Sequence, residues 1–367
     1  MRNLVAVAIV AVVLSNVSCN ELLPPPHPPE NPFNDGNLPS LETLPFGELG
    51  RGKIVFERVA GNALSFGGIY VIDAAARRSY LLFNYRTLPA GQPAFAPNGA
   101  MVAFSAFSAF TTEPPCCGSQ LHVLAADGSD VREIGAYGKS YGLSWTPDGS
   151  QIMVTASDSL GTSIYRQDTS RTTSPKLVYR FETTPDSTWT LYPPVSVSPS
   201  GRLLIAAMRR SVSPRLITWK GILAMNADGS DVTRFYTLPD SFSRAVAATW
   251  SPDGHRIAFI AGIVDSSATH RQWTTTVQVI NEDGTNRRQV SAVPTFGLNA
   301  DGYVSTFGEP VPLSLCWTSD GSHIVFSAPV EAENWHLFVT SADGSSKFVE
   351  PVTSAPGWQD TSVSCSL

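Results

Sequence analysis

The sequence predicts an all-β protein that is built from a repeated unit of four short strands. Three observations lead to this prediction. One hairpin pattern recurs along most of the chain at intervals of roughly fifty residues. A second strand–turn–strand pattern follows most copies of that hairpin. Glycine and proline number 28 each, which is typical of many short strands joined by tight turns.

Each copy of the hairpin pattern joins a short strand to a second, apolar strand through a glycine-containing turn. Asn-Gly and Asp-Gly pairs between apolar runs are strong short-range signals for a hairpin. The copies read QPAFAPNGAMVAF at 92–104, GLSWTPDGSQIMV at 142–154, PVSVSPSGRLLIA at 194–206, AATWSPDGHRIAF at 247–259 and LCWTSDGSHIVF at 315–326.

The second pattern supplies two more strands to each unit, again through an Asp-Gly turn. It reads LHVLAADGSDVREI at 121–134, ILAMNADGSDVTRF at 222–235, VQVINEDGTNRRQV at 277–290 and LFVTSADGSSKFV at 337–349. In the third unit this turn is degenerate around 167–169. Four antiparallel strands per unit, repeated around a ring, form the blades of a β-propeller.

Together these patterns resemble the TolB-type propeller repeat, a WD-repeat-like family. The repeat reads P-x-W-S-P-D-G…I-A-F and then Y-V-x-x-A-D-G; residues 247–259 match it most fully, and the resemblance covers 51–367. Ser200 departs from it, because the family places Asp before the glycine. The resemblance implies a binding scaffold. TolB also has an α/β domain before its propeller, which a proline-rich stretch replaces here, so its specific partners do not carry over.

Both ends of the repeat region carry fragments of a unit. Near the start, 53–56, 69–72 and 79–83 read as strands two, three and four without a first strand. At the end, 357–367 reads as a lone first strand, with Cys365 where the family usually has Trp. We expect these fragments to pair and to close the ring, which removes an open sheet edge. The prediction is therefore a six-bladed propeller of four-stranded antiparallel blades.

The amino terminus reads as an export signal. Arg2 precedes an apolar run over 4–14, and small and polar residues then lead to Cys19. This resembles a bacterial lipoprotein signal, although Asn16 stands where that pattern has Leu. We expect a signal at 1–19 with lipidation at Cys19; plain secretion or a retained anchor are the alternatives. The expected location is the periplasmic side of the cell envelope, with the outer membrane favoured.

A proline-rich stretch over 20–50 separates the signal from the repeats. Its composition favours an extended, semi-rigid conformation. We expect a linker that lifts the propeller at 51–367 away from a membrane; the alternative is a tail without a role.

Composition narrows the classes of function. The net charge of −6 offers no basic patch for nucleic acid. The cysteines fit no zinc or haem spacing, and the pairing of the four beyond Cys19 is left open. Those four are Cys116, Cys117, Cys316 and Cys365.

Chain direction sorts the connections onto two faces of the predicted propeller. The tight Asp-Gly turns share one face, and nearly all the long connections open on the other. Loops on a rigid scaffold commonly carry binding surfaces, and aromatic side chains and arginine commonly anchor them. The candidate binding residues on this long-loop face are Trp189, Tyr192, Arg209, Arg210, Trp219, His270, Arg271, Trp273, Trp335 and Trp358.

No motif for chemistry stands in a credible context. Residues 138–142 match G-x-S-x-G, but they enter a predicted strand, whereas the nucleophile elbow needs a strand-to-helix turn. The six histidines show no i,i+2 or i,i+4 pair, and the aspartates of the turns are expected to cap those turns rather than to bind calcium. We expect no catalytic residue, no metal and no cofactor.

The sequence thus favours a non-catalytic binding or scaffold protein of the cell envelope with a protein partner. The alternative is a carbohydrate-active or other hydrolytic propeller with its site at the channel mouth. That alternative needs carboxylates that converge there, and Glu57, Glu113, Asp158 and Asp265 are the candidates. A third possibility is a surface protein with a purely structural role.

Overall fold

The computed structural model is all β over the residues that it describes. These are 44–60, 63–85, 90–107, 119–137, 139–170, 174–242, 244–265, 272–292, 296–297, 314–331, 334–345, 350–353 and 358–366. Within these ranges, no helix is long and apolar enough to cross a membrane.

The strands follow one another along the chain with short turns between most of them. They are β1 (Lys53–Ala60), β2 (Ala63–Asp73), β3 (Arg78–Tyr85), β4 (Ala90–Phe95), β5 (Met101–Phe107), β6 (Ser119–Ala125), β7 (Val131–Tyr137), β8 (Lys139–Trp145), β9 (Gln151–Asp158), β10 (Gly161–Asp168), β11 (Lys176–Glu182), β12 (Ser187–Val197), β13 (Leu203–Ser211), β14 (Ile217–Met225), β15 (Thr233–Thr237), β16 (Arg244–Trp250), β17 (Arg256–Asp265), β18 (Gln272–Asn281), β19 (Arg288–Ala292), β20 (Phe296–Gly297), β21 (Leu315–Trp317), β22 (His323–Glu331), β23 (Asn334–Ser341), β24 (Glu350–Pro351) and β25 (Trp358–Cys365).

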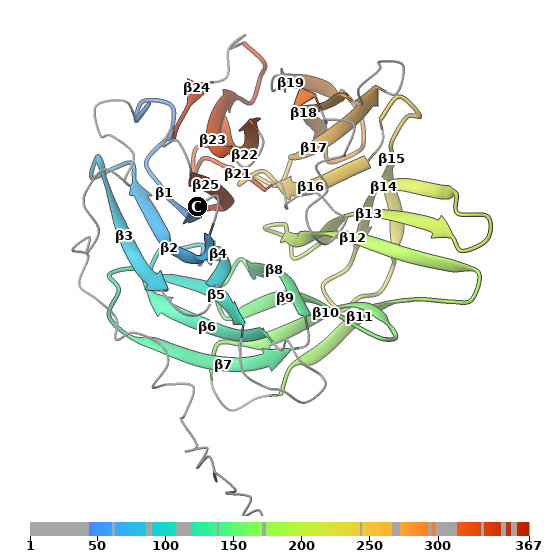
Figure 1. The fold of residues 1–367 in the computed structure, drawn as a ribbon, viewed down its shortest axis with the longest axis horizontal. Helices are drawn as coiled ribbons and strands as arrows, with labels where there is room; N and C mark the ends of the chain where they lie inside the picture. The colour runs from blue at the N-terminus through green and yellow to red at the C-terminus, as the bar shows by residue number, and fades with distance from the viewer. Residues whose placement is uncertain are drawn as a thin grey trace, which may run out of the picture.

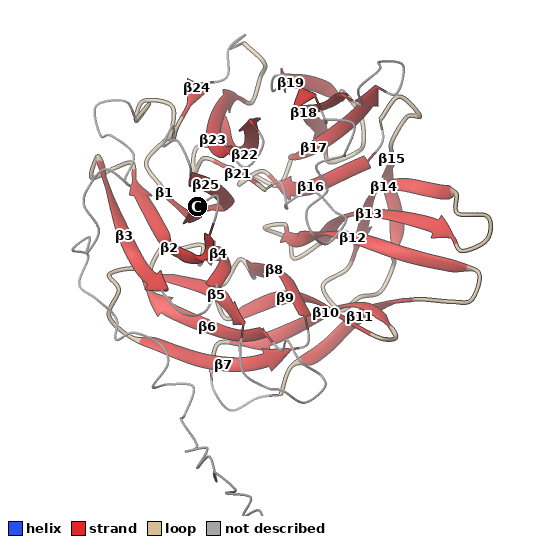
Figure 2. Cartoon of the chain, viewed as in Figure 1, coloured by secondary structure: helices blue, strands red, loops and turns tan. Residues whose placement is uncertain are grey.

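The sheets are arranged around a central channel, which confirms the predicted propeller fold (Figure 1). Residues of β4, β8, β12, β16, β21 and β25 line the channel, so these are the innermost strands. From β4, β8, β12 and β16 the chain runs outward through consecutive antiparallel strands, with loops at the strand ends (Figure 2).

The hairpin between β16 and β17 shows how the local sequence specifies a turn and a buried strand. Between β16 and β17, the Gly254 amide donates to the Ser251 carbonyl at 2.9 Å, and Gly254 has a φ of 75° that a residue without Cβ adopts at little cost. The strand that follows reads IAFIA over 257–261, and all five residues are 0% exposed. A strand buried on both faces needs such an unbroken apolar run, because neighbouring sheets cover both its sides.

The prediction of six separate four-stranded blades is wrong. Four sheets stand as separate blades, formed by β4–β7, β8–β11, β12–β15, and β16–β19 with β20 added. The remaining strands form one eight-stranded sheet in the order β21-β22-β23-β25-β1-β2-β3, with β24 on β23. The cause lies at the start of β25, where Gln359 pairs in parallel with Trp335 of β23.

The two ends of the described chain meet inside this eight-stranded sheet rather than completing a sixth blade of their own. β1 pairs with β25 in antiparallel register, from Ile54 opposite Cys365 to Ala60 opposite Trp358. A disulfide between Cys316 and Cys365, 49 residues apart, joins β21 to β25. The sequence left this pairing open; Cys116 and Cys117 lie outside the described residues.

The sheet of β12–β15 extends further than the repeat pattern predicts. The sequence placed Trp189, Arg209 and Trp219 in connections of the long-loop face. Instead, β12 begins at Ser187, β13 continues to Ser211 and β14 begins at Ile217. The hairpin register runs from Val197 opposite Leu203 out to Ser187 opposite Ser211. We call the outer part, residues 187–192, 206–211 and 217–222, the arm; it projects at the right-hand edge of Figure 1.

Candidate functional site

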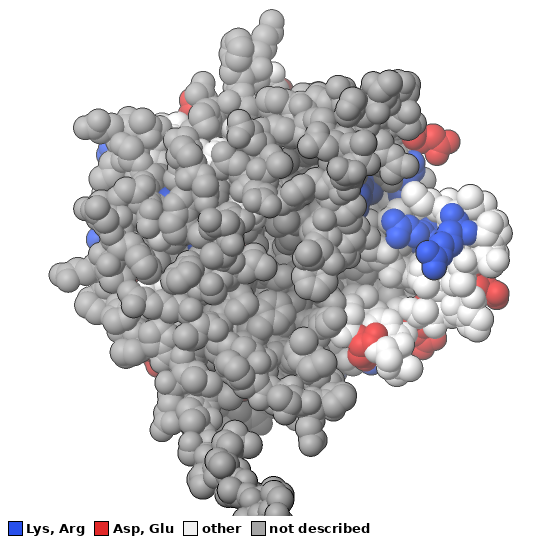
Figure 3. All heavy atoms as spheres, viewed as in Figure 1, with Lys and Arg blue, Asp and Glu red and all other residues white. Residues whose placement is uncertain are grey.

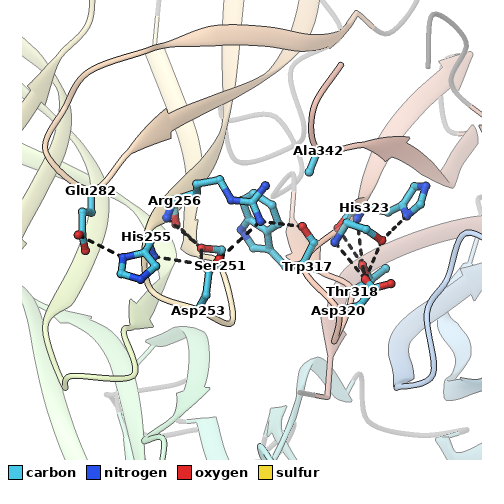
Figure 4. A network of polar contacts seen from close by, with 12 residues as sticks. Ser251, Asp253, His255, Arg256, Glu282, Trp317, Thr318, Asp320, His323 and Ala342 are labelled. Atoms are coloured by element: carbon cyan, nitrogen blue, oxygen red, sulfur yellow. Dashed lines mark hydrogen bonds and ion pairs between the residues drawn. The ribbon is translucent and has the colours of Figure 1, made fainter. Parts of the chain in front are cut away.

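The tight turns of the inner hairpins form a repeated hydrogen-bonded motif (Figure 4). In the turn after β16, Asp253 Oδ1 accepts hydrogen bonds from the Ser251 hydroxyl and from the His255 amide, the latter at 3.0 Å. The turn after β21 repeats the arrangement, with Asp320 Oδ1 accepting from the Thr318 hydroxyl at 2.6 Å. The aspartates therefore organise turns.

The electrostatics of the turns agree with this structural role. Hydrogen bonds from the Thr146 hydroxyl and from the amide and hydroxyl of Ser150 lower the pKa of Asp148 to about 2. A carboxylate that accepts several hydrogen bonds is stabilised in its charged form. Within the described ranges, no group of three or more His, Cys, Asp or Glu side chains is placed to hold a metal ion.

On the face that carries these tight turns, one arginine joins two sheets (Figure 4). The Cζ atom of Arg256 in β17 lies 4.8 Å from the ring centroid of Trp317 in β21. Its Nη2 atom donates to the Gly321 carbonyl at 2.9 Å. The contact combines a cation–π interaction with a charge-assisted hydrogen bond, so it stabilises the junction between the sheets.

The central channel contains a cavity of about 260 Å³. Its wall is made of prolines, small residues, aromatic rings and hydroxyl side chains, among them Ser144, Ser196 and Thr249. Apart from the disulfide-bonded cysteines, none of the described residues that line it has an ionisable side chain. The wall of the cavity is therefore uncharged and mostly apolar, with a few hydroxyl groups.

The tryptophans at the ends of the innermost strands tie neighbouring sheets together. The Trp145 Nε1 atom donates to the Ala94 carbonyl at 2.9 Å, and the Trp317 Nε1 atom donates to the Thr249 carbonyl at 3.3 Å. Both rings are buried. The Trp of the repeat is thus a packing residue at the inner wall.

The arm brings together three of the predicted binding residues. The rings of Trp189 and Trp219 meet edge to face with centroids 6.0 Å apart, and the Arg209 Cζ atom lies 5.7 Å from the Trp189 centroid. Phe181 of β11 extends the cluster, at 5.5 Å from Trp189. We call Phe181, Trp189, Arg209 and Trp219 the arm cluster. Aromatic rings beside an arginine are the side chains that most often anchor interfaces.

Hydrogen bonds hold the arm cluster in one geometry. Trp219 is buried, and its Nε1 atom donates to the Thr237 hydroxyl at 3.0 Å. Arg209 Nη2 donates to the Ser187 hydroxyl at 3.0 Å. Trp189 is partly exposed. The cluster therefore presents an accessible Trp ring on a rigid support.

The other predicted binding residues do not join this cluster. Tyr192 is buried in β12, with the Arg244 Cζ atom 5.9 Å from its ring centroid. Trp335 is buried in β23, and Arg210 is half-buried in β13. Trp273 and Trp358 lie in β18 and β25. His270, Arg271 and the predicted lipidation site Cys19 lie outside the described residues.

Several of the residues considered for chemistry have defined positions in the described chain. Ser140 and Gly142 of the G-x-S-x-G pattern lie inside β8, which is a strand and not the elbow before a helix. Asp158 pairs with Arg180 at 3.2 Å, and Glu57 accepts a 3.5 Å hydrogen bond from Ser362. Glu113 is not among the described residues.

Two features of the structure had no signal in the repeat pattern. An apolar stretch at the end of the arm is exposed, at Val212, Leu216 and Ile217. A fully buried ion pair joins Arg58 to Asp360 across β1 and β25. Residues 211–217 read as part of a connection on the long-loop face, and a single Arg or Asp in a strand gives no hint of its partner.

Comparisons with known proteins show the fold alone. No family model and no curated protein matches the chain. Among solved structures, TolB from Acinetobacter baumannii is 16% identical to this chain, with a TM-score of 0.59. The match covers 86% of this chain and 66% of that chain, which is slightly less than two thirds of the length of that TolB. A chain of the nidogen/laminin complex is 11% identical with a TM-score of 0.55, over 86% of this chain and 98% of that chain. The described chain is therefore a β-propeller with a TolB-like fold.

Proposed function

We propose that this chain is a non-catalytic binding protein of the cell envelope and that its arm cluster receives a protein partner. The observation that carries the proposal is the contact of Trp189 with Trp219 and Arg209 on a projecting, hydrogen-bonded sheet. Preorganised aromatic and arginine side chains lose little conformational freedom on binding, so each gains more net affinity.

The uncharged channel supports a binding role over a hydrolytic one. Glycoside hydrolysis needs two carboxylates that face one substrate across a short distance. The described residues that line the channel cavity include no carboxylate and no histidine. The described part of this wall therefore offers no side chain of the kind that usually serves as a general acid or base.

The proposal includes the domain organisation and location that the sequence predicts. A signal at 1–19 with lipidation at Cys19, a linker at 20–50 and a propeller of the TolB-type family at 51–367 would hold the arm near a membrane on the periplasmic side, with the outer membrane favoured. Mass spectrometry of the mature amino terminus tests this part, because a lipidated Cys19 has a distinct mass and an unmodified Cys19 contradicts it.

Affinity purification from envelope extracts tests the binding role. We expect a partner at one-to-one stoichiometry with the unmodified chain, and binding weakened about tenfold or more by Trp189→Ala or Arg209→Gln. Arg202→Gln is the matched control, since Arg202 lies at the other end of the same hairpin. Equal recovery with Trp189→Ala and Arg202→Gln, or no stoichiometric partner, would contradict the proposal.

A further inference from the structure

The end of the arm exposes apolar side chains to solvent. Residues 211–217, which we call the tip, connect β13 to β14. Val212, Leu216 and Ile217 are 42%, 59% and 49% exposed. Only two other large hydrophobic residues are exposed in the described part of the chain, Leu160 and Leu177.

The tip is held in a defined shape by its own hydrogen bonds. The Ser211 amide donates to the Leu216 carbonyl at 2.9 Å, and the Leu216 amide donates to the Pro214 carbonyl at 2.8 Å. The Val212 amide donates to the Asp186 carbonyl at 2.9 Å, which fixes the tip to the segment before β12. The apolar side chains are therefore displayed on an ordered turn.

Backbone hydrogen bonds connect the tip to the turn that carries Leu160. The Thr183 amide donates to the Leu160 carbonyl at 3.0 Å, so the turn between β9 and β10 lies against the segment that leads to Asp186. Residues 183–186 therefore link the turn that carries the exposed Leu160 to the tip.

Cationic side chains flank the apolar residues. Arg215 is exposed within the tip and Arg210 is half-buried just before it, and no ion pair involves either among the described residues. The exposed acidic residues on the linking segment and the Leu160 turn are Asp186, Glu182 and Asp158, and Asp158 is paired with Arg180. Figure 3 shows positive side chains gathered on the same projecting part of the surface.

We propose that the tip binds the surface of a lipid bilayer that contains anionic lipids. Aliphatic side chains enter the boundary between headgroups and acyl chains, and each arginine close to an anionic surface adds an attraction that amounts to about fivefold in affinity. The tip offers both features on a rigid projection. This inference goes beyond the protein-binding role of the arm cluster and does not depend on it.

Size favours a membrane over a second protein at the tip. A specific protein interface buries about 800 Å² on each partner, which usually requires 20–30 residues a side. Three aliphatic side chains on one turn are too few for that, whereas shallow insertion into a bilayer needs no complementary surface.

Vesicle co-sedimentation of the chain from Asn20 onward, which lacks both the apolar run at 4–14 and Cys19, tests the tip while excluding an anchor at the amino terminus. We expect binding to vesicles of phosphatidylethanolamine and phosphatidylglycerol, weakened about tenfold or more by the double change Leu216→Ser and Ile217→Ser. Changing Arg210 and Arg215 to Gln should weaken binding only when phosphatidylglycerol is present. Leu177→Ser, which alters an exposed leucine of β11, is the matched control and should bind as the parent does.

A photo-cross-linking residue in place of Leu216 identifies what the tip contacts. Adducts with lipid, formed on the vesicles and in isolated membranes, are the expected result. Adducts with a second copy of the chain or with another protein, without lipid adducts, would overturn the proposal, as would equal sedimentation of the tip variant and the Leu177→Ser control. Because Trp189 is unchanged throughout, these outcomes are independent of the arm cluster.

Discussion

Arg58 and Asp360 lie 302 residues apart in the chain and form a bidentate ion pair in which neither side chain is exposed. The Nε–Oδ1 and Nη2–Oδ2 distances are 2.5 and 2.8 Å. The two residues face each other in the register of β1 and β25. Although burial alone would raise the pKa of Asp360, the Arg58 guanidinium holds that pKa below its ordinary value. The pair therefore joins the two ends of the described chain.

Breaking this pair should destabilise the protein strongly. Asp360→Ala leaves the Arg58 charge buried without its partner, so we expect the free energy of unfolding to fall by about 3–5 kcal/mol. Urea unfolding measures the change. Arg78→Gln, which removes a partly exposed ion pair with Asp73 at 3.9 Å, is the control and should cost about 0–1 kcal/mol. Similar losses in both variants would show that the buried pair has no special role.

The disulfide between Cys316 and Cys365 should stabilise the same junction. Closing a loop of 49 residues lowers the conformational entropy of the unfolded chain, which raises the free energy of unfolding by about 4 kcal/mol. We expect reductant to lower the thermal midpoint of the parent, and the double change of both cysteines to Ser to lower it without any further effect of reductant. A reductant effect of unchanged size in the double variant would mean that other cysteines are responsible.

Burial of His122 should make stability depend on pH. Loss of solvent around the ring lowers the pKa of His122 to about 4 from its ordinary 6.5. Between pH 6.5 and pH 4, His122 is therefore protonated in the unfolded chain but neutral in the folded chain. Because of this difference, the free energy of unfolding falls as the pH drops from 6.5 to 4, by up to roughly 3 kcal/mol.

His122→Phe should abolish this part of the pH dependence, because the new ring can still stack on Phe104, whose centroid lies 5.2 Å away. Chemical unfolding at several pH values measures the slope. An identical slope in the His122→Phe variant would contradict the assignment.

Substitution of Gly142 tests whether this glycine of the G-x-S-x-G pattern is required for close packing between strands. A Cβ at this position would lie 2.4 Å from the Pro193 Cβ and 2.9 Å from the Pro194 Cα, so Gly142→Ala should cost about 1–3 kcal/mol. Gly47→Ala, where nothing lies within 4 Å of the new Cβ, should cost far less. Equal melting temperatures for the two variants would show that β8 and β12 are not in close contact.

The repeat pattern predicted the inner hairpins well, because their signals are local. Asp253 and Gly254 specify a turn, and the apolar run after them specifies a buried strand, so β16 and β17 follow from a dozen residues. The division into sheets depends instead on one pairing between Trp335 and Gln359, which no local pattern encodes. That is why the predicted number of separate blades is wrong.

The candidate site was predicted in part for the same reason. Large aromatic and arginine residues pointed to Trp189, Arg209 and Trp219, and the structure brings these three together. The prediction that these residues lie in loops was wrong. The prolines and polar residues near Pro193 and Pro214 read as loops, although β12, β13 and β14 extend into these regions. The exposure of Leu216 was not predicted, since an apolar residue in a connection can be either buried or exposed.

Site-specific photo-cross-linking at Trp189 in intact cells tests the proposed function most directly. An aromatic cross-linking residue, which keeps a ring in place of Trp189, should give one dominant protein adduct, and the same residue in place of Leu177 should not give it. The adduct should disappear when Arg209→Gln is added. A pattern of adducts shared by positions 189 and 177, or the absence of any protein adduct at 189, would contradict a partner at the arm cluster.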